Sequence, residues 1–452
     1  MPDPVFPLGL AWVNGALLRA GYATRWIDFQ TDSFHALEQT LAEFQPDFIG
    51  LSLRNIDDVL IRERETYFGE FLSLCGSLRQ RTTAPLILGG SGFSIYPERL
   101  LELAEADYGI CGEGEHSLVA LIRALESGDG PGPIPGLVRR GEQAVMRNGA
   151  SLADLSQDTS LPVRPERLVA HYLKTSGMLN VQTQRGCPHG CCFCAYPVLE
   201  GRLWRQRPAE AVAEEMAELE RAGARYVFIV DSVFNSSATH VTAVCEALLR
   251  RGLRLRWGCF LRPQGLTREL MRLMARAGLA HIEFGTDSFC DEVLSEYGKA
   301  FRFEDVLQAA ELARREQIEQ CHFLIVGGPG ESVATLQTSF RNSLRLGDVT
   351  IMAITGMRIY PGTPLSHRAQ AEGVVEPGSD LLAPVYYVAP GLTTDEIFEI
   401  LRRFVGQSPN WIAGHPPPAY QQLVERLRQR GVVGPLWSYV PPVQRLWQQA
   451  AV

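Results

Sequence analysis

The sequence lacks the features that would place the protein in a membrane, in the secretory pathway or on nucleic acid. No run approaches the ~18 consecutive apolar residues that a membrane-spanning helix needs. The first residues, MPDPVFPLGLAWVNG, carry neither the basic start nor the small-residue cleavage site of a signal peptide. There is no long basic run, and the net charge is -8. We therefore expect a cytoplasmic protein with no membrane span and no nucleic-acid partner.

Cysteine is scarce, yet four of the 10 cysteines fall in the single stretch QRGCPHGCCFCAYP. Cys187, Cys191 and Cys194 form the pattern C-x3-C-x2-C, and Cys192 lies between the last two. In a reducing compartment, clustered cysteines indicate a metal or redox centre more often than disulfides. Three soft thiolates on one short loop are suited to hold three irons of a [4Fe–4S] cluster.

Two other interpretations of the cysteine loop stay open. Structural zinc usually takes four ligands, often from two separated C-x2-C pairs, and a second pair is missing from the chain. Cys192 or His189 would then have to complete the site, although adjacent cysteines in a tight loop do not easily form a tetrahedron. The remaining interpretation is that these are buried cysteines with no ligand.

Residues 1–125 alternate strand and helix patterns. The apolar runs DFIGLSLR and APLILGG are typical of buried strands, and FGEFLSLCGSLRQR has the spacing of an amphipathic helix. We expect a further strand in ATRWIDF, after a glycine turn. Repeated strand–helix units predict a parallel, doubly wound sheet that binds its ligand at the carboxyl ends of the strands.

The rest of the chain divides into three parts. The Gly- and Pro-rich stretch ESGDGPGPIPG marks a boundary, and residues 126–175 are expected to be a linker with hairpin-like pieces. Six strand–helix units follow over residues 176–372. Six are too few for a closed eight-stranded barrel but enough for a partial, TIM-like (β/α)6 barrel with its site at the strand carboxyl ends. Residues 373–452 predict a small helical C-terminal region whose aromatic residues, Trp437 among them, cap the barrel or pack outside it.

With the cysteine loop placed after the first barrel strand, the sequence resembles the radical S-adenosylmethionine (SAM) enzymes. Their signature is C-x3-C-x2-C at this position, and the aromatic Phe193 before the last cysteine also matches. The resemblance implies that Cys187, Cys191 and Cys194 ligate the cluster and that SAM chelates the fourth iron. It also implies that Cys192 is not a ligand.

Polar and small residues after later barrel strands are the candidates to bind SAM. The family often has a Gly-Gly-Glu segment after the second strand; this chain has FIVDSVFN there, which is similar to the cobalamin-containing branch. FGTDS follows the fourth strand, and VGGPGES follows the fifth, where small residues let the backbone approach the adenine. Each of these polar groups would equally suit a strand-end cap. The candidates are Phe193, Asp231, Ser232, Asn235, Asp287, Ser288 and Gly328.

The N-terminal half resembles the Rossmann- or flavodoxin-like cobalamin (B12)-binding domain fused to many radical SAM enzymes, through PLGL, LSLR, LILGG and DYGICGEGE. A flavodoxin-like fold that binds a nucleotide, or nothing, is the alternative. The chain lacks the D-x-H-x-x-G motif whose histidine coordinates cobalt. Arg54 and Asn55 are therefore candidates for the space beneath cobalt, unless Arg54 pairs with Asp57. The implied cobalamin-binding residues are Ser52, Arg54, Asn55, Gly89, Gly90, Glu113 and Gly114.

The resemblance implies an enzyme that cleaves SAM with its cluster and transfers a methyl group from methylcobalamin to a carbon of a small-molecule or lipid-like substrate. An external electron donor of the flavodoxin or ferredoxin type is implied as well. The alternatives are a cyclisation or rearrangement with accessory cobalamin and, from another class, a cobalamin-sensing regulator. Tyr196, Arg358 and Tyr360 flank strand ends and are candidates for the pocket, although each would equally serve packing.

Overall fold

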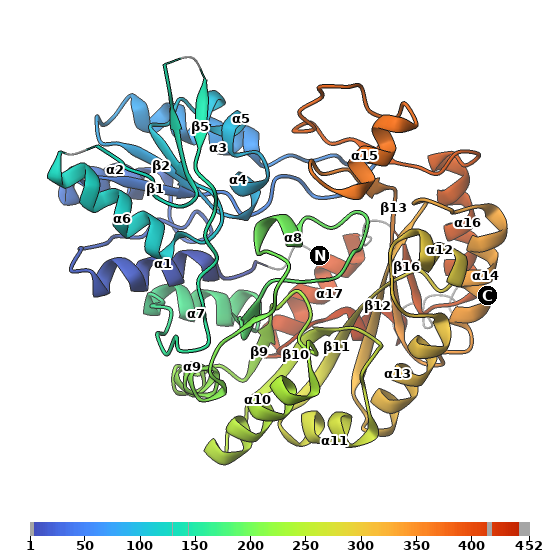
Figure 1. The fold of residues 1–452 in the computed structure, drawn as a ribbon. Helices are drawn as coiled ribbons and strands as arrows, with labels where there is room; N and C mark the ends of the chain where they lie inside the picture. The colour runs from blue at the N-terminus through green and yellow to red at the C-terminus, as the bar shows by residue number, and fades with distance from the viewer. Residues whose placement is uncertain (1–3, 129, 143, 414–417, 443–452) are drawn as a thin grey trace.

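The computed structural model describes residues 4–128, 130–142, 144–413 and 418–442, and it consists of two α/β modules side by side (Figure 1). The N-terminal module has a five-stranded sheet in the order β1-β2-β3-β4-β5. Strands β1 to β3 are parallel, and β4 and β5 continue the sheet as an antiparallel hairpin. Its elements are α1 (Leu8–Arg19), α2 (Phe34–Phe44), β1 (Ile49–Ser52), α3 (Phe68–Arg79), β2 (Leu86–Gly89), α4 (Ser91–Ile95), α5 (Pro97–Leu103), β3 (Tyr108–Ile110), α6 (Gly114–Ser127), β4 (Leu137–Arg140) and β5 (Val145–Arg147).

The second module is an open parallel sheet in the order β6-β9-β10-β11-β12-β13-β16. The first six strands form the predicted partial barrel, which is confirmed, although the sixth, β13, begins four residues before the apolar run at 354–361 that predicts it. Amphipathic helices cover the outer face; α11, for example, buries Leu270, Met271 and Met274. The elements are α7 (Glu166–Thr175), β6 (Leu179–Val181), α9 (Ala209–Arg221), β9 (Tyr226–Ile229), α10 (Ala238–Arg251), β10 (Arg256–Leu261), α11 (Arg268–Arg276), β11 (Leu279–Asp287), α12 (Asp291–Glu296), α13 (Phe303–Arg315), β12 (Glu319–Val326), α14 (Val333–Ser343) and β13 (Thr350–Thr355).

Short elements surround the carboxyl end of this sheet. The C-terminal region from residue 373, which the sequence predicts to be helical, also contains strands. Strand β16 extends the sheet beside β13, and β15 pairs with β14. Trp437 lies inside the barrel, where its indole nitrogen donates to Glu283 (2.9 Å). The remaining elements are β7 (Gln184–Arg185), α8 (Tyr196–Leu199), β8 (Arg205–Gln206), β14 (Met357–Arg358), α15 (Pro364–Ala371), β15 (Tyr386–Tyr387), α16 (Thr394–Gln407), β16 (Trp411–Ala413), α17 (Pro418–Gln429) and a 3-10 turn at Trp437–Tyr439.

Two local predictions differ from the structure. The expected strand in residues 23–29 does not form, because this segment is tied to α7 instead of a sheet: Arg167 donates to the Trp26 carbonyl (2.8 Å) and Tyr172 to Asp28 (2.8 Å). The expected linker over 126–175 does contain the expected hairpin, β4 and β5, but this hairpin extends the N-terminal sheet, and α7 packs on the barrel core.

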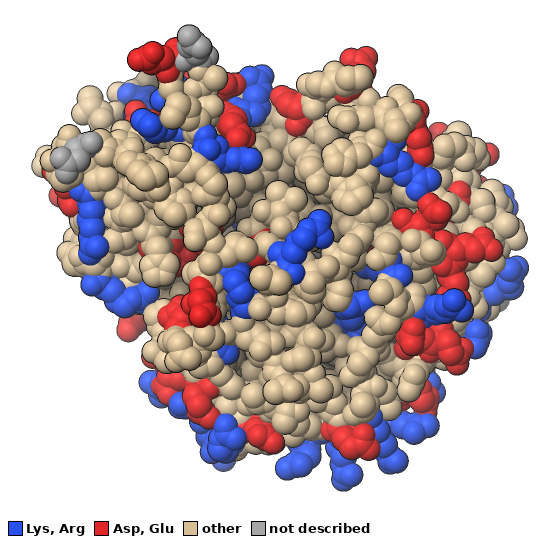
Figure 2. Space-filling model, in the orientation of Figure 1, with Lys and Arg blue, Asp and Glu red and all other residues tan. Residues whose placement is uncertain are grey.

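The two modules share a continuous apolar core. One buried cluster joins residues of the N-terminal module, such as Leu53 and Phe93, to Met357 and Tyr387 of the second module. Charges of both signs are interspersed around the periphery, and the surface is hollowed between the N-terminal module and the α15 segment (Figure 2). Within the described residues, none of the helices is both long enough and apolar enough to span a bilayer.

Candidate functional site

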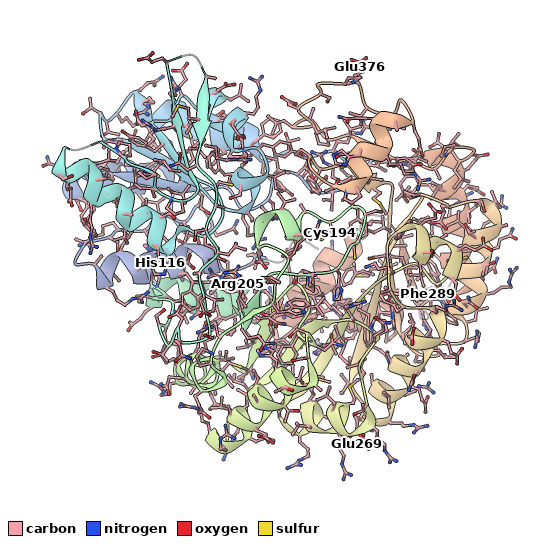
Figure 3. The ribbon with its side chains drawn as sticks, viewed as in Figure 1. His116, Cys194, Arg205, Glu269, Phe289 and Glu376 are labelled. Atoms are coloured by element: carbon pink, nitrogen blue, oxygen red, sulfur yellow. The ribbon has the colours of Figure 1, made fainter. Side chains whose placement is uncertain are left out.

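The cysteine loop runs from β7 to α8 and lies between the two modules, where Figure 3 shows Cys194. Its first residue, Gly186, has a φ of 89°, which favours glycine, and its carbonyl accepts from the Ser232 hydroxyl (3.1 Å). The Cys187 amide donates to the Gly201 carbonyl (3.0 Å). The start of the loop is therefore held by the chain around it.

The three thiols of the pattern interact with one another. Burial raises the pKa of Cys194 to about 12, and the charges of Cys191 and Cys187 contribute in the same direction. All ten cysteines are free. Among the described residues, no three His, Cys, Asp or Glu side chains are close enough to hold a single metal ion. A [4Fe–4S] cube takes soft thiolate ligands that need not share one ion, and this donor set fits it.

Cys192 also has a partner outside the cysteine loop. Its thiol lies 4.0 Å from the sulfur of Met357, in the apolar core between the modules. Its amide donates to the Tyr297 carbonyl (3.0 Å), which fixes this orientation. His189, the other extra zinc candidate, lies against Arg262, with its Nδ1 2.9 Å from an Arg262 nitrogen. Both residues thus have partners other than the three cysteines of the pattern, and the expectation that neither is a ligand stays a prediction.

Two cations that the sequence did not predict flank the loop. The Lys299 ammonium pairs with Asp287, donates to the Gly285 carbonyl (3.2 Å) and interacts with Cys191. The Arg262 guanidinium interacts electrostatically with Cys187 and Cys191. Positive charge near thiolates favours the ionised, metal-binding form. Neither YGKAF nor FLRPQ has a pattern that signals this position, because the barrel brings separate strand ends together.

The residues expected after the second barrel strand are engaged within the protein. Asp231 is fully buried and accepts from the Thr183 amide (2.7 Å) and hydroxyl (2.5 Å). Asn235 holds the loop after β10 by donating to the Arg262 carbonyl (2.9 Å) and accepting from the Arg262 amide (2.9 Å). With Ser232 on Gly186, all three brace the cysteine loop and its neighbours, so the cap interpretation fits better than direct SAM contact.

The candidates on the fourth strand lie in different places. Asp287 has a φ of 63° and faces Lys299, next to the cysteine loop. Phe193 lies nearby, with the Lys299 nitrogen 5.6 Å from its ring centre. Ser288 is buried and turns toward α14, where its hydroxyl lies 3.3 Å from that of Ser339. Asp287 and Phe193 are thus beside the expected cofactor, and Ser288 is not.

Gly328 packs tightly at the loop after β12. An added Cβ would lie 2.5 Å from the Tyr297 hydroxyl, to which the Gly328 amide donates (3.1 Å). The buried Glu331 carboxylate accepts from Tyr297 (3.3 Å) and from the Gly327 amide (3.3 Å). Burial raises the pKa of Glu331 to about 7. Tyr297 and Glu331 therefore set the shape of this glycine turn.

Replacing Glu331 by Gln is expected to flatten the pH dependence of stability. The folded protein binds the Glu331 proton more tightly than the unfolded chain, so this group stabilises the fold fully below its ordinary pKa of 4.5. That stability is lost as pH rises from 4.5 to about 7, by up to about 1.4 kcal/mol per pH unit. Denaturation midpoints of wild type and Glu331→Gln over this range measure the difference. The exposed Glu304→Gln is the control, and parallel wild-type and Glu331→Gln curves would contradict the assignment.

The carboxyl ends of β1, β2 and β3 face the second module and present the predicted cobalamin residues. Gly90 has a φ of 97°, and an added Cβ would lie 2.5 Å from the Leu53 carbonyl, so glycine is needed for the packing of the loops. Ser52 and Asn55 are exposed on the same edge, and Gly89 is half-buried. This edge is the usual ligand-binding side of a doubly wound sheet.

Arg54 has no ion pair among the residues that the structure describes, since Asp57 is taken by Arg358. Arg54 is exposed at the edge of the N-terminal module, and its charge interacts with the nearby phenols Tyr172, Tyr196 and Tyr67. Although part of the side chain is open to solvent, the protein around the guanidinium partly desolvates it and lowers its pKa. The alternative pairing with Asp57 is therefore wrong, and the guanidinium remains available to a ligand between the modules.

Glu113 and Gly114 lie at the junction with the barrel. The Glu113 carboxylate pairs with Arg205 (2.5 Å) and Arg185 (3.5 Å), and Glu115 pairs with Arg185 (2.5 Å). Arg185 is only two residues before Cys187. These carboxylates therefore tie the cysteine loop to the N-terminal module.

The three pocket candidates do not form one site. Arg358 is buried, donates to Asp57 (2.7 Å) and to the Leu381 carbonyl (3.0 Å), and stacks on Tyr360 at 5.0 Å. Arg358 therefore joins the two modules, which is the packing alternative, and its place in a pocket stays a prediction. Tyr196 remains exposed, interacts with Arg54 and begins α8, which contacts α4.

Two family models match the chain, the B12 binding domain over residues 2–122 and the radical SAM superfamily over residues 181–341. Tryptophan 2-C-methyltransferase from Streptomyces laurentii is 26% identical, over 82% of this chain and 73% of its own. Hopanoid C-3 methylase from Methylococcus capsulatus is 27% identical, over 68% of this chain and 58% of its own.

Among solved structures, the radical SAM methyltransferase TsrM from Kitasatospora setae, with cobalamin and a [4Fe-4S] cluster bound, has the same fold. The TM-score is 0.88 at 24% identity, covering 100% of this chain and 98% of that one. The cobalamin-dependent radical enzyme OxsB matches with a TM-score of 0.75 at 19% identity, covering 95% of this chain and 70% of that one. The two family models together span more than half of the chain, one on each module, and so the chain belongs to the cobalamin-dependent radical SAM enzymes.

Proposed function

We propose that the protein is a cobalamin-dependent radical SAM methyltransferase that methylates a carbon of a small molecule. The observation that carries this proposal is the placement of the cysteine loop against the ligand-binding edge of the N-terminal module. Helix α8, directly after Cys194, contacts α4, directly after Gly90. The Arg185 ion pairs hold the same loop to Glu113 and Glu115. Two cofactors bound at these places would face one space.

The residues of the loop are suited to the cluster. Cys187, Cys191 and Cys194 would hold it, while Lys299 and Arg262 offset its negative charge. When bound, the cluster supplies the electron that cleaves SAM, and cobalamin carries the methyl group. Phe193, Asp287 and Gly328 are the remaining candidates for SAM. An external electron donor of the flavodoxin or ferredoxin type would reduce the cluster.

Arg54 is proposed to lie beneath cobalt, with Ser52, Asn55 and Gly89 around the cofactor. An imidazole at position 54 would supply the lower ligand that the sequence lacks. Arg54→His is therefore expected to shift the absorption spectrum of bound cobalamin toward the nitrogen-coordinated form, while Arg54→Ala leaves cobalt without that ligand. An unchanged spectrum in Arg54→His, with cobalamin still bound, would contradict this placement.

The substrate is proposed to be a small, largely apolar molecule. The relatives named above act on tryptophan and on hopanoids, both of which present apolar carbon to the enzyme. A second candidate function has support as well, since an anaerobic magnesium-protoporphyrin IX monomethyl ester cyclase from Cereibacter sphaeroides is 26% identical over 74% of this chain and 56% of its own. The non-methylating alternative therefore needs a direct test.

The test is anaerobic reconstitution with iron, sulfide, cobalamin, a low-potential reductant and SAM carrying a deuterated methyl group. Iron content, the cobalamin spectrum and SAM-derived products are measured together, with candidate apolar substrates added one at a time. A product that gains the deuterated methyl group supports the methyltransferase. A product that differs from the substrate but carries no deuterium supports the cyclase-like alternative. A protein that binds the cofactors but consumes no SAM with any of the substrates supports a regulator.

A further inference from the structure

One side of the cysteine loop is open to solvent. The loop comprises residues 186–204 and joins β7 to β8, whose antiparallel pairing forms its stem. Pro188 and Gly190, each next to a cysteine of the pattern, are exposed, and so is Arg202. Leu203, at 72%, is the most exposed of the large apolar side chains that the structure describes. We call these four residues the loop rim.

The loop rim comes from two chain segments that pack together. A Cβ on Gly186 would clash with the Leu203 carbonyl, so the two backbones touch. The rings of His189 and Trp204 form an edge-to-face pair (5.7 Å) between the same segments. Arg202 and Leu203 are therefore held against the part of the loop that contains the first two cysteines.

The rest of the chain covers the other side of the loop. Arg185 pairs with Glu113 and Glu115 of the N-terminal module, and α8 contacts α4. The Cys192 thiol lies against Met357 in the core between the modules. The loop rim therefore offers a protein partner the direct approach to the cysteines.

The loop rim is basic, although the chain as a whole carries a net charge of -8. The acid of the loop, Glu200, accepts from the Gly186 amide (3.1 Å) and from Gln182 (3.1 Å), so it is engaged within the protein. Among the described residues, neither Arg202 nor Arg262 forms an ion pair with an acid. In Figure 2, Lys and Arg side chains lie in the middle of the face, where few Asp and Glu side chains appear.

We propose that the loop rim is the docking surface of the external electron donor, an acidic one-electron carrier protein of the flavodoxin or ferredoxin type. Its carboxylates would face Arg202 and Arg262, with Leu203 in apolar contact. The reduced carrier gives one electron to the cluster and leaves oxidised. This inference rests on the proposed function, which requires a reduced cluster, and deepens it by naming where the partner binds.

The size and charge of the loop rim suit a transient redox complex. Complexes of electron-transfer proteins bury little surface, typically less than about 1,200 Å² in total. Opposite charges on the two partners raise the rate of encounter and fix their orientation. A few basic residues around one exposed apolar side chain are therefore sufficient for a carrier that has to leave after each electron.

The test measures the binding of two acidic carriers, a flavodoxin and a ferredoxin, to the anaerobic protein loaded with iron, sulfide and cobalamin. Dissociation constants are obtained by isothermal titration calorimetry at low ionic strength. Wild type is expected to bind at least one carrier, and Arg202→Glu to bind it about ten-fold more weakly or worse, because like charges then face each other. Added salt should reduce this difference by screening.

Arg140→Glu is the matched control. Arg140 is exposed on β4 of the N-terminal module, away from the cysteine loop, and the same change of charge there should leave carrier binding unchanged. Arg202→Lys keeps the charge and should bind like wild type. Leu203→Ser should weaken binding at high and low salt alike. Iron content and reduction by dithionite, which needs no docking surface, should be the same in all variants; if Arg202→Glu loses its iron, Leu203→Ser decides in its place.

Binding of neither carrier to wild type, or equal binding to wild type and Arg202→Glu, would overturn the proposal. A dimer that Leu203→Ser dissociates, with carrier binding unchanged, would assign the loop rim to a second copy of the chain and overturn it as well. Carrier binding that depends on Arg202 in a protein that methylates nothing would overturn only the proposed reaction. Methyl transfer with a chemical reductant, in a protein whose carrier binding ignores Arg202, would overturn only this inference.

Discussion

Replacing Cys187 by Ala is expected to abolish cluster assembly and the SAM cleavage that depends on it, while cobalamin still binds. Cys187 is buried at the start of the loop, and its thiol interacts with Cys191 and with the hydroxyl of Ser232. Two thiols would then remain for three irons, and soft thiolate ligation is what holds such a cluster. Iron and sulfide per chain, together with release of 5′-deoxyadenosine, measure the loss.

Cys192→Ala is the matched control in the same loop. Its thiol faces Met357 in the core between the modules, so this variant should keep its iron and its SAM cleavage. Equal loss of iron in both variants would show that Cys192 takes part in the metal site. A wild-type protein that binds one zinc and no iron would overturn the whole radical interpretation.

Replacing Arg358 by Ala is expected to lower the free energy of unfolding by about 3–5 kcal/mol, because it leaves Asp57 charged and buried without its partner. The pair is 2.7 Å long, and the side chains of Arg358 and Asp57 are 3% and 0% exposed. Arg358 also satisfies the Leu381 carbonyl. Urea unfolding of the cofactor-free protein measures the effect.

Arg99→Ala is the control for this loss. Arg99 pairs with Asp380 across the same junction (3.2 Å), but about half of each side chain is exposed. Exposed pairs contribute roughly 0–1 kcal/mol, so this variant should be nearly as stable as wild type. If Arg358→Ala were as stable as Arg99→Ala and only catalysis were lost, Arg358 would be a pocket residue as the sequence analysis expected.

The barrel strands and the cysteine loop could be predicted because their signals are local. Runs such as YVFIVD and CHFLIVGG are apolar over the length of one strand, and C-x3-C-x2-C fits within one loop. The role of Arg358 could not be predicted in this way. Its partner Asp57 is 301 residues away, and a polar residue at a strand end has the same local pattern whether it faces a pocket or another module.

The orientation of the Asp231 side chain could not be predicted from the local sequence either. A carboxylate at the end of a barrel strand normally faces the ligand side. Here the neighbouring strand end presents the Thr183 amide and hydroxyl at 2.7 and 2.5 Å, which turn the carboxylate inward. The side chains that do reach the cysteine loop, Lys299 and Arg262, come from segments with no distinctive spacing. Their positions follow from the curvature of the sheet.

The pairing of Arg185 and Arg205 with Glu113 and Glu115 bears on how such enzymes can be recombined. A chimera that joins this N-terminal half to a foreign barrel would leave the Glu113 and Glu115 carboxylates without the arginines that now pair with them. A graft therefore has to transfer these carboxylates and their arginines together.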